Sequence, residues 1–478
     1  MNSRTLMKVV ASVAALTTVG AACGSSKASA PKASAAATTA AAAAASAATT
    51  AAAAAPASTA AAAAGAVTLK YQLWDDQQLP LYQKCADAFT AKNPTIKIDM
   101  KQLGWSDYWD GLTAGFATGN VPDVFTDHLA KYPDFIKSGV LTPIDDLVKK
   151  DNVDLTQYSP GLADLWVGYD GKRYGLPKDW DTIALLVDQN QVDKAGLKAD
   201  TFNSADWNPK DGGSWEKLIA HLTVDKNGKR GDEAGFDKAN VATYGFGMDV
   251  DAYGQTGFSS FAASNGFNYL DKDPWGTHYN YDTPALTDTI LYFKGLVEKG
   301  FMAPVELWNA TGGDTMMSTN KVASRPIGDW TINQWLKEKG IKANFVKTPK
   351  GPKGYASMFN GLADSITKSS KHQAESWQWV KFLSSPDCEN IIGAAGVVFP
   401  AIPAAAKASQ DAHKAAGVDV SAFTFHVDNK TTFLTPIAQH PAEISKLMGD
   451  AITAVLSGKG DANTLIDANK QANDLLKS

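Results

Sequence analysis

The sequence predicts an α/β protein with two lobes, and three observations support this fold class. From Val67 onward, segments with the two-residue period of a strand alternate with segments of helical spacing. The first strand–helix–strand unit is complete within about 35 residues, which is typical of a βαβ unit with parallel strands. About 410 residues follow Ala66, and a chain of that length suits two lobes better than one small core.

The first unit runs through three short segments. Apolar and polar residues alternate over residues 67–74, and apolar side chains then recur at helical spacing over residues 81–89. Asn93-Pro94 ends this helix, and alternation resumes over residues 96–100. We therefore expect a parallel pair of strands joined by a right-handed crossover helix.

The same alternation continues to the C-terminus. A second helix is expected at residues 105–116, and Gly119-Asn120 ends it before a third strand at residues 121–125. Further strands are expected at residues 173–177, 183–187, 322–327, 345–348 and 355–359. Further helices are expected at residues 284–297, 332–336, 371–383, 442–456 and 462–476.

Residues 1–22 are typical of a secretory signal peptide. Arg4 and Lys8 precede an uncharged run that ends on small residues and is too short to span a bilayer as a mature helix. Gly20-Ala21-Ala22-Cys23-Gly24 resembles a bacterial lipobox, whose cysteine is lipidated and becomes the mature N-terminus. Gly20 stands where lipoboxes usually have Leu. The alternative is an ordinary signal peptide with Cys23 there by chance.

Residues 23–66 are expected to form a disordered tether between the lipid anchor and the folded chain. They consist almost entirely of Ala, Ser and Thr, so they cannot bury enough surface to offset their ordering entropy. A coil of this length has a root-mean-square reach of about 35 Å. We therefore expect a secreted protein that is lipid-anchored to the outer face of the cell membrane.

Bulk composition restricts the classes of function. A hydrophobic content of 44% and a mean hydropathy of -0.20 describe a globular chain. The net charge of -5, without a long basic run, argues against nucleic acid as a partner. The 7 His are scattered, and we expect neither a metal nor a cofactor. Residues 225–236 resemble a calcium loop only faintly, because Arg230 and Phe236 stand where a glycine and a bidentate acid are required.

Seven short motifs occur in the order found in one protein family. They are FTAKNPTIKI at residues 89–98, GNVPDV at 119–124, GVL at 139–141, YGLP at 174–177, YGF at 244–246, GDW at 328–330 and GVVFP at 396–400. With a lipobox before them, these motifs resemble the extracellular solute-binding proteins of ABC importers, in the family of maltose-, trehalose- and other sugar-binding lipoproteins. The resemblance covers the chain from Val67 to its C-terminus.

The resemblance implies a two-lobe periplasmic-binding-protein-like fold of class II, with a ligand cleft between the lobes. Lobe 1 is expected at residues 67–158 and 361–398, and lobe 2 at residues 159–360 and 399–478. The implied function is that of a monomeric receptor without enzymatic activity. It captures a mono- to oligosaccharide and delivers it to membrane permease subunits that a cytoplasmic ATPase drives.

Candidate ligand contacts lie where strands end, because ligands of open α/β sheets bind beyond the carboxyl ends of the strands. Carboxylates accept strong hydrogen bonds from sugar hydroxyls, and indole rings cover the C–H faces of a sugar. Strand-end residues of these two types are Trp74, Asp75, Asp76, Asp127 and Trp330. Position in the family adds Trp180, Asp181, Asn360 and Phe399. Helical spacing indicates instead that Trp105, Trp109, Trp377 and Trp379 belong to the core.

Cys85 and Cys388 are an even pair once Cys23 is assigned to the lipid. The family boundaries place both in lobe 1, and an exported protein folds in an oxidising location. We therefore expect a disulfide between them, with two buried free thiols as the alternative.

Two other function classes stay open. A polyamine- or peptide-binding protein of the same fold also uses acids and aromatic rings. A secreted carbohydrate-active enzyme combines Trp with paired acids, although no Glu stands among the cleft candidates as a proton donor.

Overall fold

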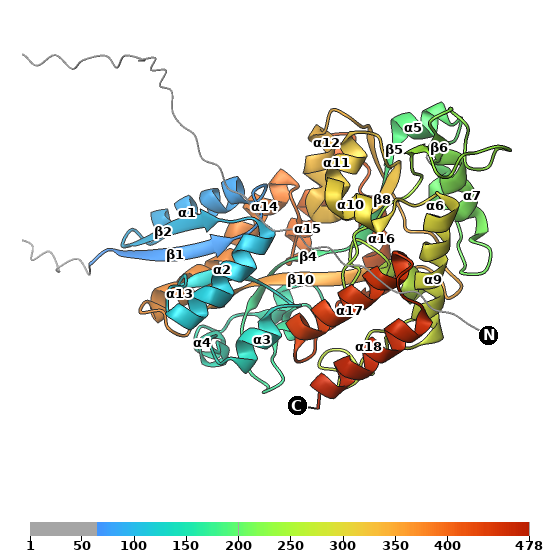
Figure 1. Cartoon of the computed structure of the whole chain (residues 1–478). Coiled ribbons are helices and arrows are strands. Elements are labelled where there is room, and N and C mark those ends of the chain that lie inside the picture. The colour runs from blue at the N-terminus through green and yellow to red at the C-terminus, as the bar shows by residue number, and fades with distance from the viewer. Residues whose placement is uncertain (1–64, 199, 478) are drawn as a thin grey trace, which may run out of the picture. The chain divides into compact units, whose positions relative to one another are not determined.

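The computed structural model describes residues 65–198 and 200–477, and its larger sheet has seven strands. These are β1 (Val67–Leu73), β2 (Ile96–Gln102), β3 (Val124–His128), β4 (Leu176–Asp181), β10 (Ser357–Ile366), β11 (Phe399–Pro400) and β12 (Thr432–Leu434). The strand order is β11-β4-β10-β3-β1-β2, and β12 pairs with β10 off this path. We define lobe 1 as this sheet with the helices packed on it (Figure 1).

The expected βαβ start is confirmed. β1 pairs with β2 in parallel, with Val67 opposite Ile96, and β1 also pairs in parallel with β3. The crossover helix α1 (Leu79–Lys92) buries Tyr82, Cys85 and Phe89 against the sheet, which is the apolar face that helical spacing predicted.

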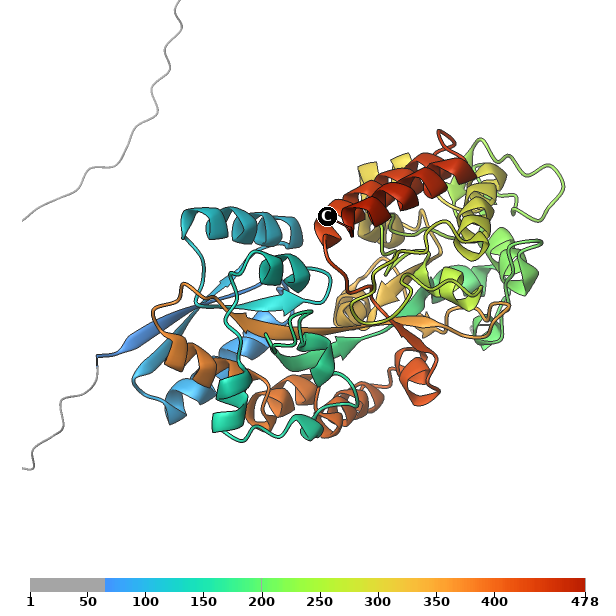
Figure 2. The ribbon, with the colours of Figure 1, turned by 90° about the horizontal axis from the view of Figure 1, so that it is seen from below.

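Helices cover both faces of this sheet (Figure 2). Helix α2 lies on one face, and α1, α13 and α14 lie on the other. The helices of lobe 1 are α1 (Leu79–Lys92), α2 (Trp105–Thr118), α3 (Tyr132–Lys137), α4 (Asp145–Lys150), α13 (Gln373–Leu383), α14 (Pro386–Ala395) and α15 (Pro403–Ala415). Short 3₁₀ helices lie at Leu155–Gln157 and Ala163–Trp166.

Lobe 2 is built around an antiparallel three-stranded sheet of order β8-β5-β9. Its strands are β5 (Ile183–Asp188), β8 (Ser324–Gly328) and β9 (Ala343–Val346), and a separate pair is β6 (Val224–Asp225) with β7 (Val241–Thr243). Its helices are α5 (Gln189–Lys194), α6 (Asp200–Asn203), α7 (Gly213–Leu222), α8 (Ser259–Ser264), α9 (Pro284–Lys299), α10 (Val305–Thr311), α11 (Gly313–Ser318), α12 (Ile332–Lys337), α16 (Ser421–Asp428), α17 (Pro441–Leu456) and α18 (Ala462–Leu475). A 3₁₀ turn, Asp329–Thr331, joins β8 to α12.

Two of the segments that connect the lobes are extended strands. Only Thr182 separates β4 in the larger sheet from β5 in the smaller one. The ten-residue strand β10 runs alongside, as Figure 1 shows, and its first residue, Ser357, bonds Ile183 of β5 through its hydroxyl. These crossing strands lie at the junction of the lobes, where a ligand cleft is expected.

The pairing of β4 departs from the expected lobe boundaries. Residues 159–360 were assigned to lobe 2, yet β4 pairs antiparallel with Asn360–Asp364 of β10 in the larger sheet. Phe399–Pro400, also assigned to lobe 2, pairs with β4 on its other side. The reason is that a strand joins the sheet that completes its hydrogen bonds, and that partner is distant in sequence.

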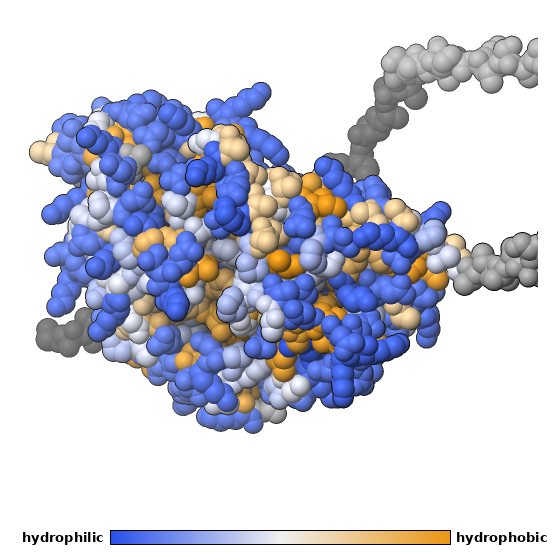
Figure 3. Space-filling view, turned by 180° about the vertical axis from the view of Figure 1, so that it is seen from behind, coloured by the Kyte–Doolittle hydropathy of each residue, from blue (hydrophilic) through white to orange (hydrophobic). Residues whose placement is uncertain are grey.

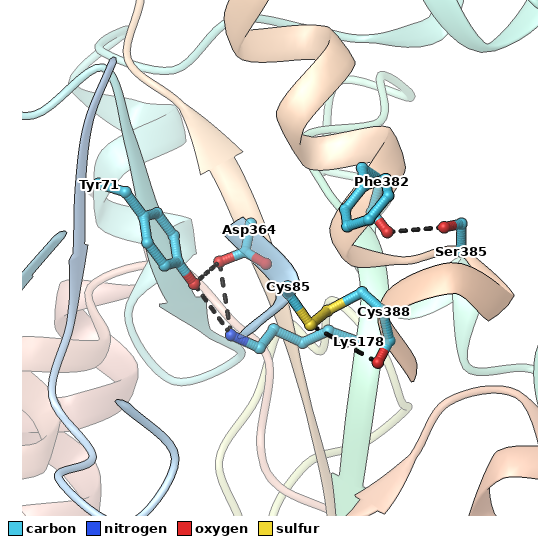
Figure 4. The surroundings of a disulfide bond; sticks show 7 residues. All are labelled: Tyr71, Cys85, Lys178, Asp364, Phe382, Ser385 and Cys388. Carbon is cyan, nitrogen blue, oxygen red and sulfur yellow. Dashed lines mark hydrogen bonds and ion pairs between the residues drawn. A yellow bond between two sulfur atoms is a disulfide. The ribbon is translucent and has the colours of Figure 1, made fainter. Parts of the chain in front are cut away.

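The expected disulfide is present. Cys85 of α1 and Cys388 of α14 are bonded with their Cα atoms 5.2 Å apart (Figure 4). Both residues are fully buried. The bond joins the first helix of lobe 1 to a segment that returns 303 residues later.

A buried ion pair lies close to this disulfide (Figure 4). Lys178 Nζ is 3.5 Å from Asp364 Oδ1, and the Tyr71 hydroxyl donates to the same oxygen at 2.8 Å. The Lys178 ammonium also lies 4.0 Å from the ring centroid of Tyr82. Lys178 is thus held inside lobe 1 by its own partners.

The surface behind the view of Figure 1 is mostly hydrophilic, and hydrophobic residues form small separate groups on it (Figure 3). Within the described residues, none of the helices has the length and apolar content to cross a bilayer. The expected signal peptide, Cys23 and the expected tether up to residue 64 lie outside the described residues.

Candidate ligand-binding site

A cavity of about 480 Å³ lies at the junction of the lobes. Lobe 1 contributes the ends of β1, β3 and β4, and lobe 2 contributes the turn after β8 and the start of α12. The volume falls within the range of about 300–1,000 Å³ that is typical of small-molecule sites. Of the expected contacts, the cavity is lined by Trp74, Asp75, Asp76, Trp180, Asp181, Trp330 and Asn360.

Trp74 stands in an aromatic cluster at the end of β1. Its ring packs edge-to-face on Trp105 and Tyr108, with centroids 5.2 and 5.3 Å away, and it tilts against Trp109. Neighbours on several sides hold the ring in one orientation. Trp74 therefore lines the cavity with a half-buried indole whose orientation is fixed by its neighbours.

Asp75 and Asp76 occupy different environments. Asp75 accepts hydrogen bonds from the backbone N–H groups of Gln77 and Gln78, so its carboxylate holds the turn that precedes α1. Asp76 is exposed and accepts from the Gln77 amide at 3.2 Å. Asp75 thus stabilises a turn at the edge of the cavity, whereas the carboxylate of Asp76 is accessible to solvent.

Trp180 presents only an edge to the cavity. Its ring stacks on Phe399 of β11 at 4.8 Å and on Phe359 of β10 at 5.8 Å. Because β4 lies between β11 and β10, the two phenylalanines cover both faces of the indole. Phe399 itself is buried behind Trp180 and does not line the cavity.

Asp181 and Asn360 form a hydrogen-bonded group where β4 and β10 meet. Gln255 of lobe 2 donates to Asp181 Oδ1 at 2.7 Å, and the Asn360 amide donates to Asp181 Oδ2 at 3.2 Å. The Asn360 amide nitrogen also lies 2.7 Å from His128 Nε2. This group links side chains of both lobes at the floor of the cavity.

Trp330 lies on the opposite wall, directly after β8. Its half-buried indole folds back over Gly328, where a Cβ atom would come within 1.7 Å of the ring. Glycine is therefore required beneath the ring. The backbone of β8 supports one side of the indole, which is the arrangement of a stacking platform.

Asp127 does not reach the cavity. Its side chain is fully buried on the far side of β3, where it accepts from the Ser365 hydroxyl at 2.9 Å and from the His128 backbone N–H at 2.8 Å. Successive residues of a strand point to opposite faces, so the cavity receives the next residue, His128, instead.

The electrostatics of the cavity are dominated by carboxyl groups. Burial raises the pKa of Asp179 to about 7, and the nearby Lys178 ammonium opposes the shift. Burial also raises the pKa values of Asp181 and Asp329 well above the usual range, and the charge of Asp179 adds to both shifts. Burial lowers the pKa of His128 to about 3, so this ring is neutral.

Several lining residues were not among the sequence candidates. Asp179 and Asp329 stand directly before the candidates Trp180 and Trp330 in the chain, and both line the cavity as well. Trp105 was expected in the core, yet it is 46% exposed and lies on the rim. The residues Gln255 and Gln334 belong to segments with no strand-end signal, and contact across the lobes is not visible in a local pattern.

Comparisons with known proteins identify the family. Residues 84–419 match the model of a family described as bacterial extracellular solute-binding proteins. A two-lobe α/β fold with a lined cavity at the lobe junction defines a solute-binding protein. This chain belongs to the bacterial extracellular solute-binding protein family of ABC transport systems.

Several solved structures of bacterial proteins share the fold. Lmo0181 of Listeria monocytogenes, an ABC substrate-binding protein solved with cycloalternan, has a TM-score of 0.73 at 18% identity, covering 86% of this chain and 99% of that one. The GacH receptor of Streptomyces glaucescens, solved unliganded and with acarbose, has a TM-score of 0.70 at 19% identity, with the same coverage. UspC of M. tuberculosis has a TM-score of 0.65 at 23% identity, over 85% of this chain and 99% of that one. The family and these neighbours are binding proteins rather than enzymes.

Proposed function

We propose that this protein is the substrate-binding lipoprotein of an ABC importer and captures a mono- to oligosaccharide in the cavity between its lobes. The observation that carries the proposal is the cavity itself, where half-buried indoles of both lobes face carboxylates and amides. Indoles match the C–H faces of sugar rings, and carboxylates match their hydroxyls. Structural neighbours solved with cycloalternan, acarbose and mannotriose support the same ligand class.

Contact residues are assigned by their place on the cavity. Trp74 and Trp330 provide stacking surfaces from opposite lobes, and Asp181 and Asn360 provide acceptors and donors on the floor. Trp180 shapes the floor with its edge. Of the remaining candidates, Asp76 is an exposed acceptor on the cavity, whereas three have supporting roles: Asp75 holds the turn before α1, Phe399 backs Trp180, and Asp127 accepts hydrogen bonds inside lobe 1.

Ligand capture is coupled to closure of the lobes. The connections through Thr182 and β10 are single extended strands, which permit hinge movement of one lobe against the other. A ligand that contacts both walls binds the closed form more tightly and therefore shifts the population toward it. The closed, loaded protein then docks on permease subunits in the membrane, which a cytoplasmic ATPase drives.

Lipid attachment at Cys23 would keep the receptor beside its permease. The tether of residues 23–66 sets the distance over which the folded chain can reach. Membership of an extracellular family supports export. The disulfide between Cys85 and Cys388 supports an oxidising location.

The proposal is tested by calorimetry and thermal shift with a panel of mono- to oligosaccharides, a peptide mixture and spermidine. A saccharide that binds at micromolar affinity and raises the unfolding midpoint supports it, because a ligand of the native state stabilises that state. Binding of peptide or spermidine alone would show a different ligand class on the same fold. New reducing ends after incubation with oligosaccharides would show an enzyme.

A further inference from the structure

We propose that the saccharide bound in the cavity carries a protonated amine, which makes the ligand a cationic amino sugar or aminocyclitol. This inference rests on the proposed function and adds the charge of the ligand to it. It comes from the balance of charges and of hydrogen-bonding groups around the cavity.

The titratable side chains that line the cavity are almost all acids. Seven aspartates line it, and neither a lysine nor an arginine does. Of these aspartates, Asp314 has a cationic partner, since Arg325 Nη1 lies 2.7 Å from its Oδ1. The closest buried cation behind the floor, Lys178, is turned to Asp364 in the interior of lobe 1. His128, on the floor, is neutral because its pKa is lowered to about 3 by burial.

Two of these aspartates are incompletely paired and buried. Asp179 and Asp329 are 2% and 1% exposed, and both line the cavity. Asp179 Oδ2 and Asp329 Oδ1 have no hydrogen-bond partner within the described residues. The other oxygen of Asp329 accepts from the Thr182 backbone N–H at 3.2 Å. A buried carboxylate oxygen without a donor is costly, so the site is short of donors.

Repulsion between neighbouring carboxylates adds to this shortage of hydrogen-bond donors. Asp179, Asp181 and Asp329 are close enough that the charge of Asp179 raises the pKa values of Asp181 and Asp329, and the charge of Asp181 raises the pKa of Asp329. Removing charges from water is unfavourable unless opposite charges compensate them. A cation between the two lobes would compensate several of these carboxylates at once.

An ammonium group fits these requirements better than a hydroxyl. A hydroxyl donates one hydrogen and also brings two lone pairs that need donors of their own. An ammonium offers three donors and no acceptor, and its hydrogen bonds to carboxylates are charge-assisted. The cavity is also lined by the indoles of Trp74 and Trp330 and by the amides of Gln255 and Gln334. These uncharged groups suit the neutral part of a sugar beside the amine.

The first test compares three disaccharides that share rings and linkage. Chitobiose has free amines, N,N′-diacetylchitobiose has amides, and cellobiose has hydroxyls at the same position. Kanamycin and mannotriose extend the comparison to a larger cationic and a larger neutral saccharide, and spermidine is a cation without a sugar ring. Calorimetry at a pH where the amines are protonated is expected to give at least tenfold tighter binding for a cationic saccharide than for its neutral counterparts.

Variants then test which carboxylates recognise the amine. Asp329→Asn and Asp179→Asn each keep the side-chain shape and remove a charge, so the ratio of cationic to neutral affinity should fall toward one. The matched control is Asp99→Asn, the same change on an exposed position of β2 outside the cavity, and it should leave the ratio unchanged. Unfolding midpoints of all three variants report whether they fold.

The outcomes separate the inference from the proposed function. Neutral saccharides that bind as tightly as cationic ones would overturn the cationic ligand and leave a sugar receptor. Binding of spermidine without any saccharide would overturn both. An affinity ratio unchanged in folded Asp329→Asn and Asp179→Asn would overturn the assignment of these carboxylates. Failure of every cationic saccharide to bind would overturn the inference as well.

Discussion

At the scale of single residues, substitutions of Trp330 and of Gly328 beneath its ring test the binding site. Trp330→Ala removes an indole platform and is expected to weaken saccharide binding by about 1.5–3 kcal/mol, ten- to a hundredfold. Gly328→Ala should cause a similar loss, because the added Cβ would stand 1.7 Å from the ring and displace it. Calorimetry measures the saccharide affinity of both variants. Unchanged affinity in Trp330→Ala would remove this residue from the site.

The control for this pair is Trp377→Ala. Trp377 is 4% exposed in the core of lobe 1, and its Nε1 donates to Asp151 at 2.9 Å. The substitution should lower the free energy of unfolding by about 3–5 kcal/mol while the affinity of the folded protein stays the same. An affinity loss equal to that of Trp330→Ala would show that binding follows stability rather than contact.

Asp179 gives a prediction about pH. Burial raises the pKa of this carboxyl to about 7, above its value in the unfolded chain, with Asp364 and Asp75 adding to the shift and Lys178 opposing it. The raised pKa contributes stability that is complete below about pH 4 and is lost as the pH rises through about 7. Asp179→Asn should therefore raise the unfolding midpoint of the ligand-free protein at pH 8 and change it little at pH 4. Equal shifts at both pH values would contradict this linkage.

Polar and aromatic residues at strand ends predicted part of the cavity lining, and the exception has a structural cause. Trp74 and Trp330 line it, as expected from aromatic residues at strand ends, and Asp181, taken from its position in the family, lines it as well. Asp127 is an exception because one step along β3 moves a side chain to the other face of the sheet. The register that decides this depends on β10, whose partner residue Ala363 is far away in sequence.

At the scale of elements, the disulfide between α1 and α14 makes a testable contribution to stability. The double variant Cys85→Ser/Cys388→Ser is expected to lower the free energy of unfolding by about 2–5 kcal/mol, because the bond restricts a loop of 303 residues in the unfolded chain. Denaturant unfolding with and without reductant measures the effect. Reductant should lower the midpoint of the parent and leave the double variant unchanged.

Thiol titration is the chemical control for the same bond. Protein that begins after Cys23, unfolded without reductant, should contain no free thiol. Two free thiols per chain would contradict the bond.

The elements themselves were predicted where the pattern was local. The β1–α1–β2 unit follows from alternation and helical spacing over one short stretch. By contrast, all six residues of β4 are buried, so the strand shows no alternation that marks its sheet. Its place between β10 and β11 results from pairing with segments distant in the chain, and the expected lobe boundaries missed it for that reason.

At the scale of the whole molecule, lipid attachment at Cys23 predicts where the protein is found. Cells fed an alkyne analogue of palmitate should label the protein, and Cys23→Ser should lose the label and release the folded chain from the membrane fraction. The matched control is the double variant Cys85→Ser/Cys388→Ser, which should keep the label. Labelling of Cys23→Ser at the level of the parent would exclude Cys23 as the lipid site.

The hinge between the lobes predicts a change of shape on binding. The two walls of the cavity belong to different lobes, and the lobes are joined by extended strands at Thr182 and β10. A saccharide that bridges Trp74 and Trp330 favours the form in which these walls approach each other. Small-angle scattering should therefore show a smaller radius of gyration when a saccharide that binds in calorimetry is added at saturation. A saccharide that does not bind should leave the radius unchanged, and so should the binding saccharide added at the same concentration to a folded variant that has lost affinity for it. An unchanged radius with a saturating ligand would mean that the cavity receives its ligand without movement of the lobes.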